Sequence, residues 1–274
     1  MKTASQKADV VRSTLQRARG CGRLQMGARG LEVLYQQGCL KLRLPRVVAG
    51  APPEAVVINS SGGVTGGDRL ALEVGLGAGS ALSVASQTAE RIYRATDGTA
   101  EIANRLEVGR DARLDWLPQE TILFDGAALS RRLEVNMAEN ARLLAVETLV
   151  FGRAAMGERV QRLHLRDHWR VRRGGRLIWA DSLRLDRPST PERAGLCGVN
   201  ALSTLLMVTP DVEAYLSPVR AILAKTEAVE AAASAWDGKL IVRLLSADAQ
   251  KLRNALVPLL IELRGLALPR VWML

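Results

Sequence analysis

The chain has 274 residues, about 1.8 times a typical domain, and 48% of them are hydrophobic against 24% charged, which excludes an intrinsically disordered protein. No apolar run approaches the roughly 18 residues of a membrane helix, and the first thirty residues lack an export signal, so we expect a cytoplasmic protein. The 38 Lys and Arg residues against 28 Asp and Glu give a net charge of +10, which indicates an acidic partner.

Short alternating runs broken by Gly, Pro, Asn and Asp fill residues 30–209 and are typical of β-strands, for example at 31–35, 40–44 and 176–185. The triplet Leu-Glu-Val begins three similar segments, at residues 72–74, 106–108 and 133–135. Each copy precedes a polar residue followed by Thr. Repeated strand pairs bury their apolar faces by stacking, so the sequence predicts a mainly β protein with an elongated, solenoid-like or β-helix-like body of layered strands.

Stacking in register would place Gln87, Glu120 and Glu147 on adjacent strands, about 5 Å apart per step. Two carboxylates at that distance repel by roughly 3 kcal/mol at an effective dielectric near 20. They would require a cation, an arginine or a shared proton. The alternative is that each carboxylate is solvated or hydrogen-bonded to a turn on its own.

Two helices are expected near the C-terminus. Asp211 opens the first, to about Lys225, with Ser217-Pro218 breaking or restarting it. The second runs from Ala247 to about Arg264, with Ser246 as its cap, leucines along one face and Gly265 at its end. Between them, residues 232–242 predict a hairpin that turns at Asp-Gly.

Residues 60–69 read Ser-Ser-Gly-Gly-Val-Thr-Gly-Gly-Asp-Arg. A phosphate-binding loop needs Lys followed by Ser or Thr after its last glycine, and Asp68 stands there instead. A tight loop that presents Asp68 is the better interpretation.

Cysteine and histidine patterns predict neither a tight metal site nor a catalytic triad. Cys21, Cys39 and Cys197 lack metal-ligand spacing, and their role is not indicated. His164 and His168 lie on an expected strand, where four residues span about 13 Å, so they cannot share an ion.

Arginines gather around the expected hairpin near residues 162–176. A solvated surface is one interpretation, and an interface with an acidic protein or with RNA is the other. The interface candidates are Arg162, Arg166, Arg170, Arg173 and Arg176.

Five sequence blocks in a fixed order resemble the urease accessory protein family UreD, also called UreH. They are Ser61-Gly-Gly-Val-Thr-Gly-Gly-Asp68, Arg91-Ile-Tyr93, Leu117-Pro-Gln-Glu-Thr-Ile-Leu-Phe124, Phe151-Gly-Arg153 with Gly157-Glu158, and Leu268-Pro-Arg-Val-Trp272. The resemblance implies a single domain over residues 18–274, preceded by a variable extension at 1–17.

The resemblance also implies a mostly β fold with two helices and a maturation factor that is not an enzyme. Its partners would be apo-urease and UreF, and through UreF the GTPase UreG, with a homodimer inside the complex as a further option. On this basis we expect a scaffold for nickel insertion and a nickel conduit, with nickel bound only transiently and no tightly bound cofactor, nucleic acid or membrane. The candidate channel-lining or interface carboxylates are Asp68, Glu120, Glu147 and Asp181.

Two other functions stay open at this point. An Arg-rich β protein that binds RNA or another polyanion is one, and it would show a steep salt dependence of binding. A hydrolase that uses Glu120 and Glu147 as a carboxylate pair is the other.

Overall fold

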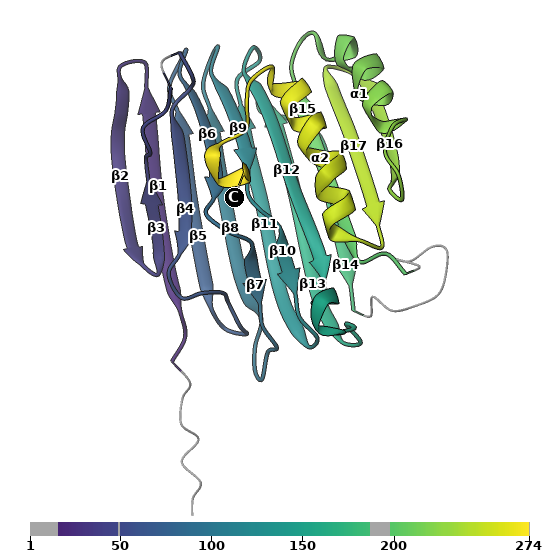
Figure 1. Ribbon diagram of the computed structural model, residues 1–274. Coiled ribbons are helices and arrows are strands. Elements are labelled where there is room, and N and C mark those ends of the chain that lie inside the picture. Colours follow the sequence, from purple (N-terminus) through teal and green to yellow (C-terminus); the bar gives the residue numbers. More distant parts are fainter. Residues whose placement is uncertain (1–15, 49, 187–197, 274) are drawn as a thin grey trace, which may run out of the picture.

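The computed structural model describes residues 16–48, 50–186 and 198–273. Two β-sheets pack face to face, and helices cover the outer face of one of them (Figure 1). We call the sheet without helices sheet A; its order is β14-β13-β11-β8-β5-β1-β2. Its strands are β1 (Arg19–Gly27), β2 (Gly30–Gly38), β5 (Arg69–Leu76), β8 (Ala100–Val108), β11 (Ala127–Met137), β13 (Leu163–Arg173) and β14 (Arg176–Leu185).

The second sheet, sheet B, has the order β16-β17-β15-β12-β9-β6-β4-β3, with β10 paired to β12 and β7 paired to β10. Its strands are β3 (Leu40–Arg43), β4 (Glu54–Asn59), β6 (Ala81–Ser86), β7 (Glu90–Ile92), β9 (Arg113–Leu117), β10 (Thr121–Leu123), β12 (Arg142–Phe151), β15 (Ala201–Val208), β16 (Glu230–Trp236) and β17 (Lys239–Ser246).

The chain alternates between the sheets, from β5 to β6, from β8 to β9 and from β11 to β12, and successive strands within each sheet are parallel. Antiparallel strands complete both sheets at their ends. This arrangement confirms the prediction of a solenoid-like β body. The helices are α1 (Leu216–Leu223) and α2 (Ala249–Arg264), with three short 3-10 turns, η1 (Ala154–Met156), η2 (Val212–Tyr215) and η3 (Arg270–Met273).

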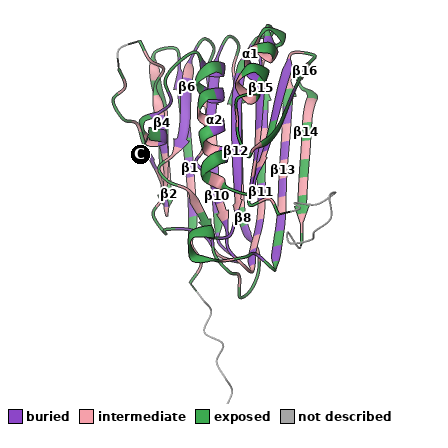
Figure 2. Ribbon diagram, turned by 45° about the vertical axis from the view of Figure 1, so that its right-hand side comes forward, coloured by how far each residue is buried: buried purple, intermediate pink, exposed green. Residues whose placement is uncertain are grey.

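The apolar core has two layers, because sheet B is covered on both sides. Inward-facing side chains such as Leu106, Leu133 and Leu143 fill the space between the sheets. On the other side of sheet B, Leu256 and Leu260 of α2 pack against its outer face. Figure 2 shows the buried residues concentrated in the strands between the sheets and on the sheet-facing side of α2.

The repeat stacks, but not in the register that its sequence suggested. In sheet A, Leu72 and Leu133, the first residues of their triplets, both pair with Asn104 of the strand between them. The middle triplet begins two residues later, at Leu106, and a shift of two residues keeps its side chains on the same face of the sheet. In sheet B, β9 aligns Arg113 with Arg142, whereas β10 aligns Thr121 with Leu149. The step from β9 to β10 therefore changes the offset by one residue, and a one-residue change exchanges the two faces of a strand.

Two details of the predicted helices are corrected. The α-helical part of the first begins only at Leu216, after η2, because Pro218 is tolerated in a first turn. The cap of α2 is Asp248 rather than Ser246: the Asp248 carboxylate accepts hydrogen bonds from the amides of Gln250 and Lys251. The predicted Gly265 terminus and the Asp237-Gly238 hairpin are confirmed. Among the described residues, no helix is both long enough and apolar enough to cross a bilayer.

Candidate functional site between the sheets

A cluster of charged side chains lies buried between the two sheets. Arg131 projects from β11 and forms a two-pronged ion pair with Asp167 of β13, with Nε–Oδ1 and Nη2–Oδ2 distances of 3.1 and 2.6 Å. The same Nη2 lies 2.7 Å from Oε2 of Glu147, which comes from β12 in the opposite sheet. Arg131 also donates to Thr121 Oγ1. One buried cation therefore links two buried carboxylates across the sheets.

Glu147 is the least satisfied member of this cluster. Its Oε1 accepts a hydrogen bond from Trp116 Nε1 at 3.1 Å, whereas Oε2 is buried and has a charge contact with Arg131 but no hydrogen bond of good geometry. Burial, reinforced by the neighbouring Asp167, raises the pKa of Glu147 to about 7, although Arg131 opposes the shift. Burial lowers the pKa of Arg131 by itself, but the two carboxylates together raise it, so this guanidinium stays charged.

Two small cavities flank the cluster. Cavity 1, about 90 Å³, is lined by Trp116, Gln119 and Glu90 as well as Arg131 and Glu147. Burial raises the pKa of Glu90, against the effect of a hydrogen bond from Asn59. Cavity 2, about 70 Å³, lies on the other side of the cluster. Because Arg131 and Glu147 line both cavities, they form the partition between them.

Asp181 lines cavity 2 together with Glu147, so the structure brings two of the four predicted carboxylates to one space. The Asp181 side chain pairs with Arg243 of β17, and its main-chain carbonyl accepts from Arg170. The Asp181 side chain is 25% exposed, whereas that of Glu147 is 3% exposed. Cavity 2 therefore extends from the buried cluster toward Asp181 on the edge strand β14 and Arg243 on β17.

Asp68 lies elsewhere and stabilises a turn. One oxygen of its buried carboxylate accepts from the Ala18 amide and the other from the Thr65 amide, both at 2.8 Å. These contacts match the predicted tight loop. With both oxygens engaged by main chain, Asp68 ties the start of β1 to the glycine-rich block.

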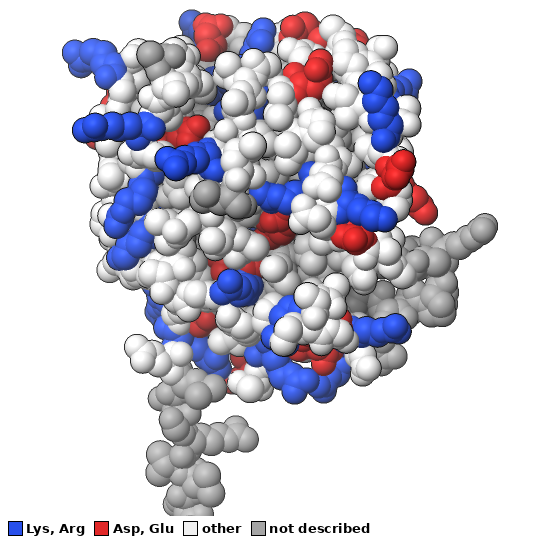
Figure 3. All heavy atoms as spheres, viewed as in Figure 1, with Lys and Arg blue, Asp and Glu red and all other residues white. Residues whose placement is uncertain are grey.

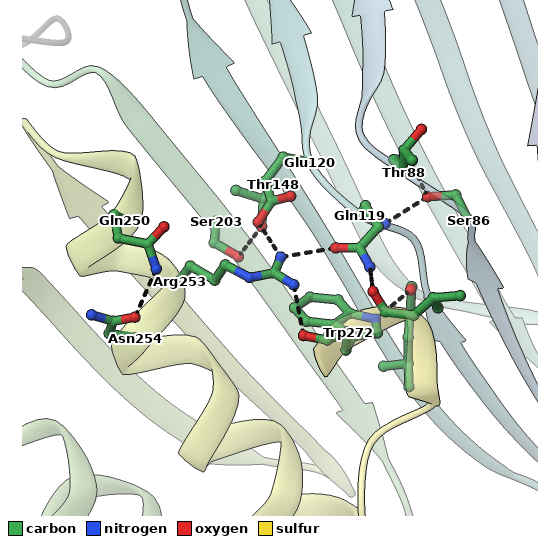
Figure 4. Close-up of polar contacts among 12 residues, drawn as sticks. Ser86, Thr88, Gln119, Glu120, Thr148, Ser203, Gln250, Arg253, Asn254 and Trp272 are labelled. Carbon is green, nitrogen blue, oxygen red and sulfur yellow. Dashed lines mark hydrogen bonds and ion pairs between the residues drawn. The ribbon is translucent and has the colours of Figure 1, made fainter. Parts of the chain in front are cut away.

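Glu120 faces away from Glu147, which corrects the expectation that the two would stack. The register of β10 places Glu120 on the outer face of sheet B, where its Oε1 lies 2.6 Å from Arg253 of α2 (Figure 4). Glu147 points inward to Arg131. Because the two carboxylates lie on opposite sides of sheet B, they cannot serve as a carboxylate pair, and this geometry removes the proposed hydrolase.

A second buried ion pair fixes the end of α2 to sheet B. Arg264 donates to Asp115 Oδ2 at 2.9 Å and to Ser83 Oγ at 2.9 Å, while Arg113 contacts the other oxygen of Asp115 and the carbonyl of Arg264. Both Arg264 and Asp115 have side chains only 2% exposed. The helical layer is thus held at a fixed position over β9.

The predicted interface arginines lie along β13 and its flanking turns, but several are already engaged. Arg166 pairs with Asp186, Arg170 donates to two main-chain carbonyls, and Arg173 lies near Glu139. Arg162 and Arg176 are exposed. Their role in an interface stays a prediction.

Charges of both signs are mixed over the surface. Across the outer face of sheet A, Arg23, Glu73, Arg105 and Glu134 form a continuous ladder of ion pairs. On the face that carries α2, Lys and Arg are likewise interspersed with Asp and Glu (Figure 3). A polyanion would meet carboxylates as well as arginines on these faces, which disfavours the nucleic-acid alternative.

Sequence reasoning missed Arg131, Asp167 and Glu90. A signal for the first two exists, because alternation places Arg131 on the same face of its strand as Leu129 and Leu133, and Asp167 likewise shares a face with apolar neighbours. A charged residue at an apolar position of a strand predicts a buried ion pair. In the described part of the chain, no group of three or more His, Cys, Asp or Glu side chains is placed to hold a metal ion.

The fold and the site define a solenoid-like β protein with carboxylates enclosed between its sheets and a helical layer fixed on one side. The sequence profile described as UreD urease accessory protein matches residues 18–273. The chain is also 49% identical to "Urease accessory protein UreD" of Rhizobium leguminosarum bv. viciae, over 94% of this chain and 96% of the relative, and 49% identical to that of Dinoroseobacter shibae, over 98% and 96%. A relative from Methylobacterium sp. is 46% identical over 93% of each chain.

The chain therefore belongs to the UreD family of urease accessory proteins, as its sequence blocks suggested. Its function is that of an accessory protein and not of an enzyme.

The buried position of Glu147 predicts a specific pH dependence of stability. Because the pKa in the folded protein is about 7 against an ordinary value of 4.5, the native state holds a proton that the unfolded chain releases between these values. The free energy of unfolding should therefore fall by roughly 3 kcal/mol from this group as the pH rises through that window. In Glu147→Gln this contribution is absent. Urea unfolding between pH 4.5 and 8 should therefore show the stability of the variant rising relative to that of the wild type as the pH increases. If the free energies of unfolding of the two proteins changed with pH in parallel, the pKa of Glu147 would not be raised. Glu134→Gln, at an exposed position, is the control.

Proposed function

We propose that the protein is a scaffold in urease maturation that binds apo-urease and UreF, recruits UreG through UreF, and passes nickel through the space between its sheets. The observation that carries the nickel proposal is the shared lining of cavity 2 by Glu147 and Asp181, with cavity 1 and Glu90 beyond the partition. Nickel is cargo in this proposal and not a resident cofactor.

The chemistry of the lining suits a cation that moves on. Carboxylate oxygens bind a divalent ion of borderline softness less tightly than imidazole or thiolate groups do. Arg131 and Arg243 compensate Glu147 and Asp181, so each carboxylate has a protein partner that competes with the ion. Weak sites at intervals allow an ion to enter and also to leave.

The scaffold proposal is tested by co-expressing the full chain with the urease subunits and UreF and separating the products by size exclusion. We expect co-elution with both partners that survives high salt, because a folded protein interface is screened less than contacts to a polyanion. Elution of the chain apart from both partners contradicts the scaffold. Association with nucleic acid that disappears steeply with salt would instead support the polyanion alternative.

A further inference from the structure

The C-terminal turn η3 lies against the strand ends that form the outer wall of cavity 1. Trp272 Nε1 donates to the carbonyl of Leu117 at 2.9 Å, where β9 ends. Gln119, two residues further, donates from Nε2 to the carbonyl of Val271 at 2.7 Å. Cavity 1 is lined by Trp116, Pro118 and Gln119, so the turn packs on the outside of residues whose other sides border the cavity.

Gln119 is held from three directions. Its main-chain nitrogen donates to Ser86 Oγ at 2.8 Å, and its side-chain nitrogen donates to the C-terminal turn. Its Oε1 accepts from Arg253 Nη1 at 2.8 Å (Figure 4). Ser86 also lines cavity 1. Gln119 therefore links the chain just beyond the paired ends of β6 and β9, and its position depends on groups outside the sheet.

Arg253 contacts Gln119, the neighbouring Glu120 and the C-terminal turn. Its guanidinium pairs with Glu120, donates to Gln119, donates to the carbonyl of Trp272 and lies 4.7 Å from the centre of the Trp272 ring. Arginine suits this position because its planar fork makes several hydrogen bonds at once and stacks on an aromatic ring. Loss of this one side chain removes one hydrogen bond from Gln119 and another from the turn, and leaves them held by the bonds to Val271 and Leu117.

The geometry points to Gln119 as a gate of the inter-sheet cavity, positioned by Arg253 and the C-terminal turn, so that displacement of the turn opens cavity 1 on the α2 face. The purpose of such an opening rests on the proposed passage of nickel. The opening itself does not rest on that proposal, because access to the cavity is measurable without nickel. A protein partner that binds over α2 and η3 would be placed to work this gate.

Access is measured in the full chain with its three cysteines replaced by serine and Asn104→Cys, a residue that lines cavity 1, as the reporter. The probe is a small cationic methanethiosulfonate reagent. In the Arg253→Gln background we expect the modification rate of the reporter to rise about tenfold, because charge-assisted hydrogen bonds are lost. Gln119→Ala should have the same effect, and Arg253→Lys an intermediate one.

Two controls separate gating from general loosening. Arg220→Gln removes an arginine of α1 that contacts the carbonyl of Ala233, and should leave the rate unchanged. A second reporter, Thr204→Cys in cavity 2, should be modified at the same rate with and without Arg253→Gln. A rise confined to the cavity 1 reporter supports the gate. Equal rises at both reporters, or no rise in either Arg253→Gln or Gln119→Ala, overturn it.

Discussion

Replacing Arg131 with Met is expected to lower the free energy of unfolding by about 3–5 kcal/mol, since it leaves two buried carboxylates without their cation. Glu147 and Asp167 are both almost fully enclosed, so without the guanidinium their charges are left poorly solvated. The loss should be smaller at acid pH, where Glu147, whose pKa is raised by burial, is protonated. Urea unfolding at pH 5 and pH 8 measures both effects.

The matched control is Arg105→Met on the outer face of sheet A. Arg105 contacts Glu73 and Glu134 but is 53% exposed, so its loss should cost less than about 1 kcal/mol. Adding Glu147→Gln and Asp167→Asn to Arg131→Met should recover much of the stability, because the uncompensated charges are removed. A loss no larger than that of Arg105→Met would show that the cluster is not a buried ion triad.

Neutralising Glu147 or Asp181 is expected to lower urease activation about tenfold at limiting nickel, the usual scale for losing one group that tunes a metal's environment. The physical reason is that each substitution removes an anionic oxygen from cavity 2 while keeping the size of the side chain. Glu147→Gln and Asp181→Asn are therefore the informative changes. Urease activity in cells that produce all the maturation proteins is the measurement.

Glu134→Gln, on the outer face, should leave activation unchanged and serves as the control. Glu120→Gln should act differently from Glu147→Gln, because Glu120 holds Arg253 outside the sheet. Wild-type activation in both Glu147→Gln and Asp181→Asn, with the chain present in normal amount, would remove the conduit from the proposal.

The fold was largely predictable because local sequence patterns determine its strands and helices. Alternating apolar residues, the repeated Leu-Glu-Val triplets and the leucine face of α2 each report a periodicity that one strand or helix must satisfy. The solenoid-like stacking follows from the repeat, since strand pairs of this kind need neighbours to bury their apolar faces.

The site was less predictable because it depends on registers between distant segments. A one-residue change between β9 and β10 places Glu120 outside and leaves Glu147 inside, and nothing in either local sequence marks that change. The anchor between Arg264 and Asp115 joins residues 149 positions apart. The family resemblance implies a channel or interface role for Asp68, whereas its contacts show a carboxylate that holds a turn.

The most direct measurement is the nickel content of urease purified from cells that contain either the wild-type protein or the Glu147→Gln, Asp181→Asn double variant. We expect both proteins to co-purify with urease in equal amount, while nickel per urease active site falls about tenfold or more with the variant. Equal nickel contents in the two preparations would contradict the passage of nickel between the sheets.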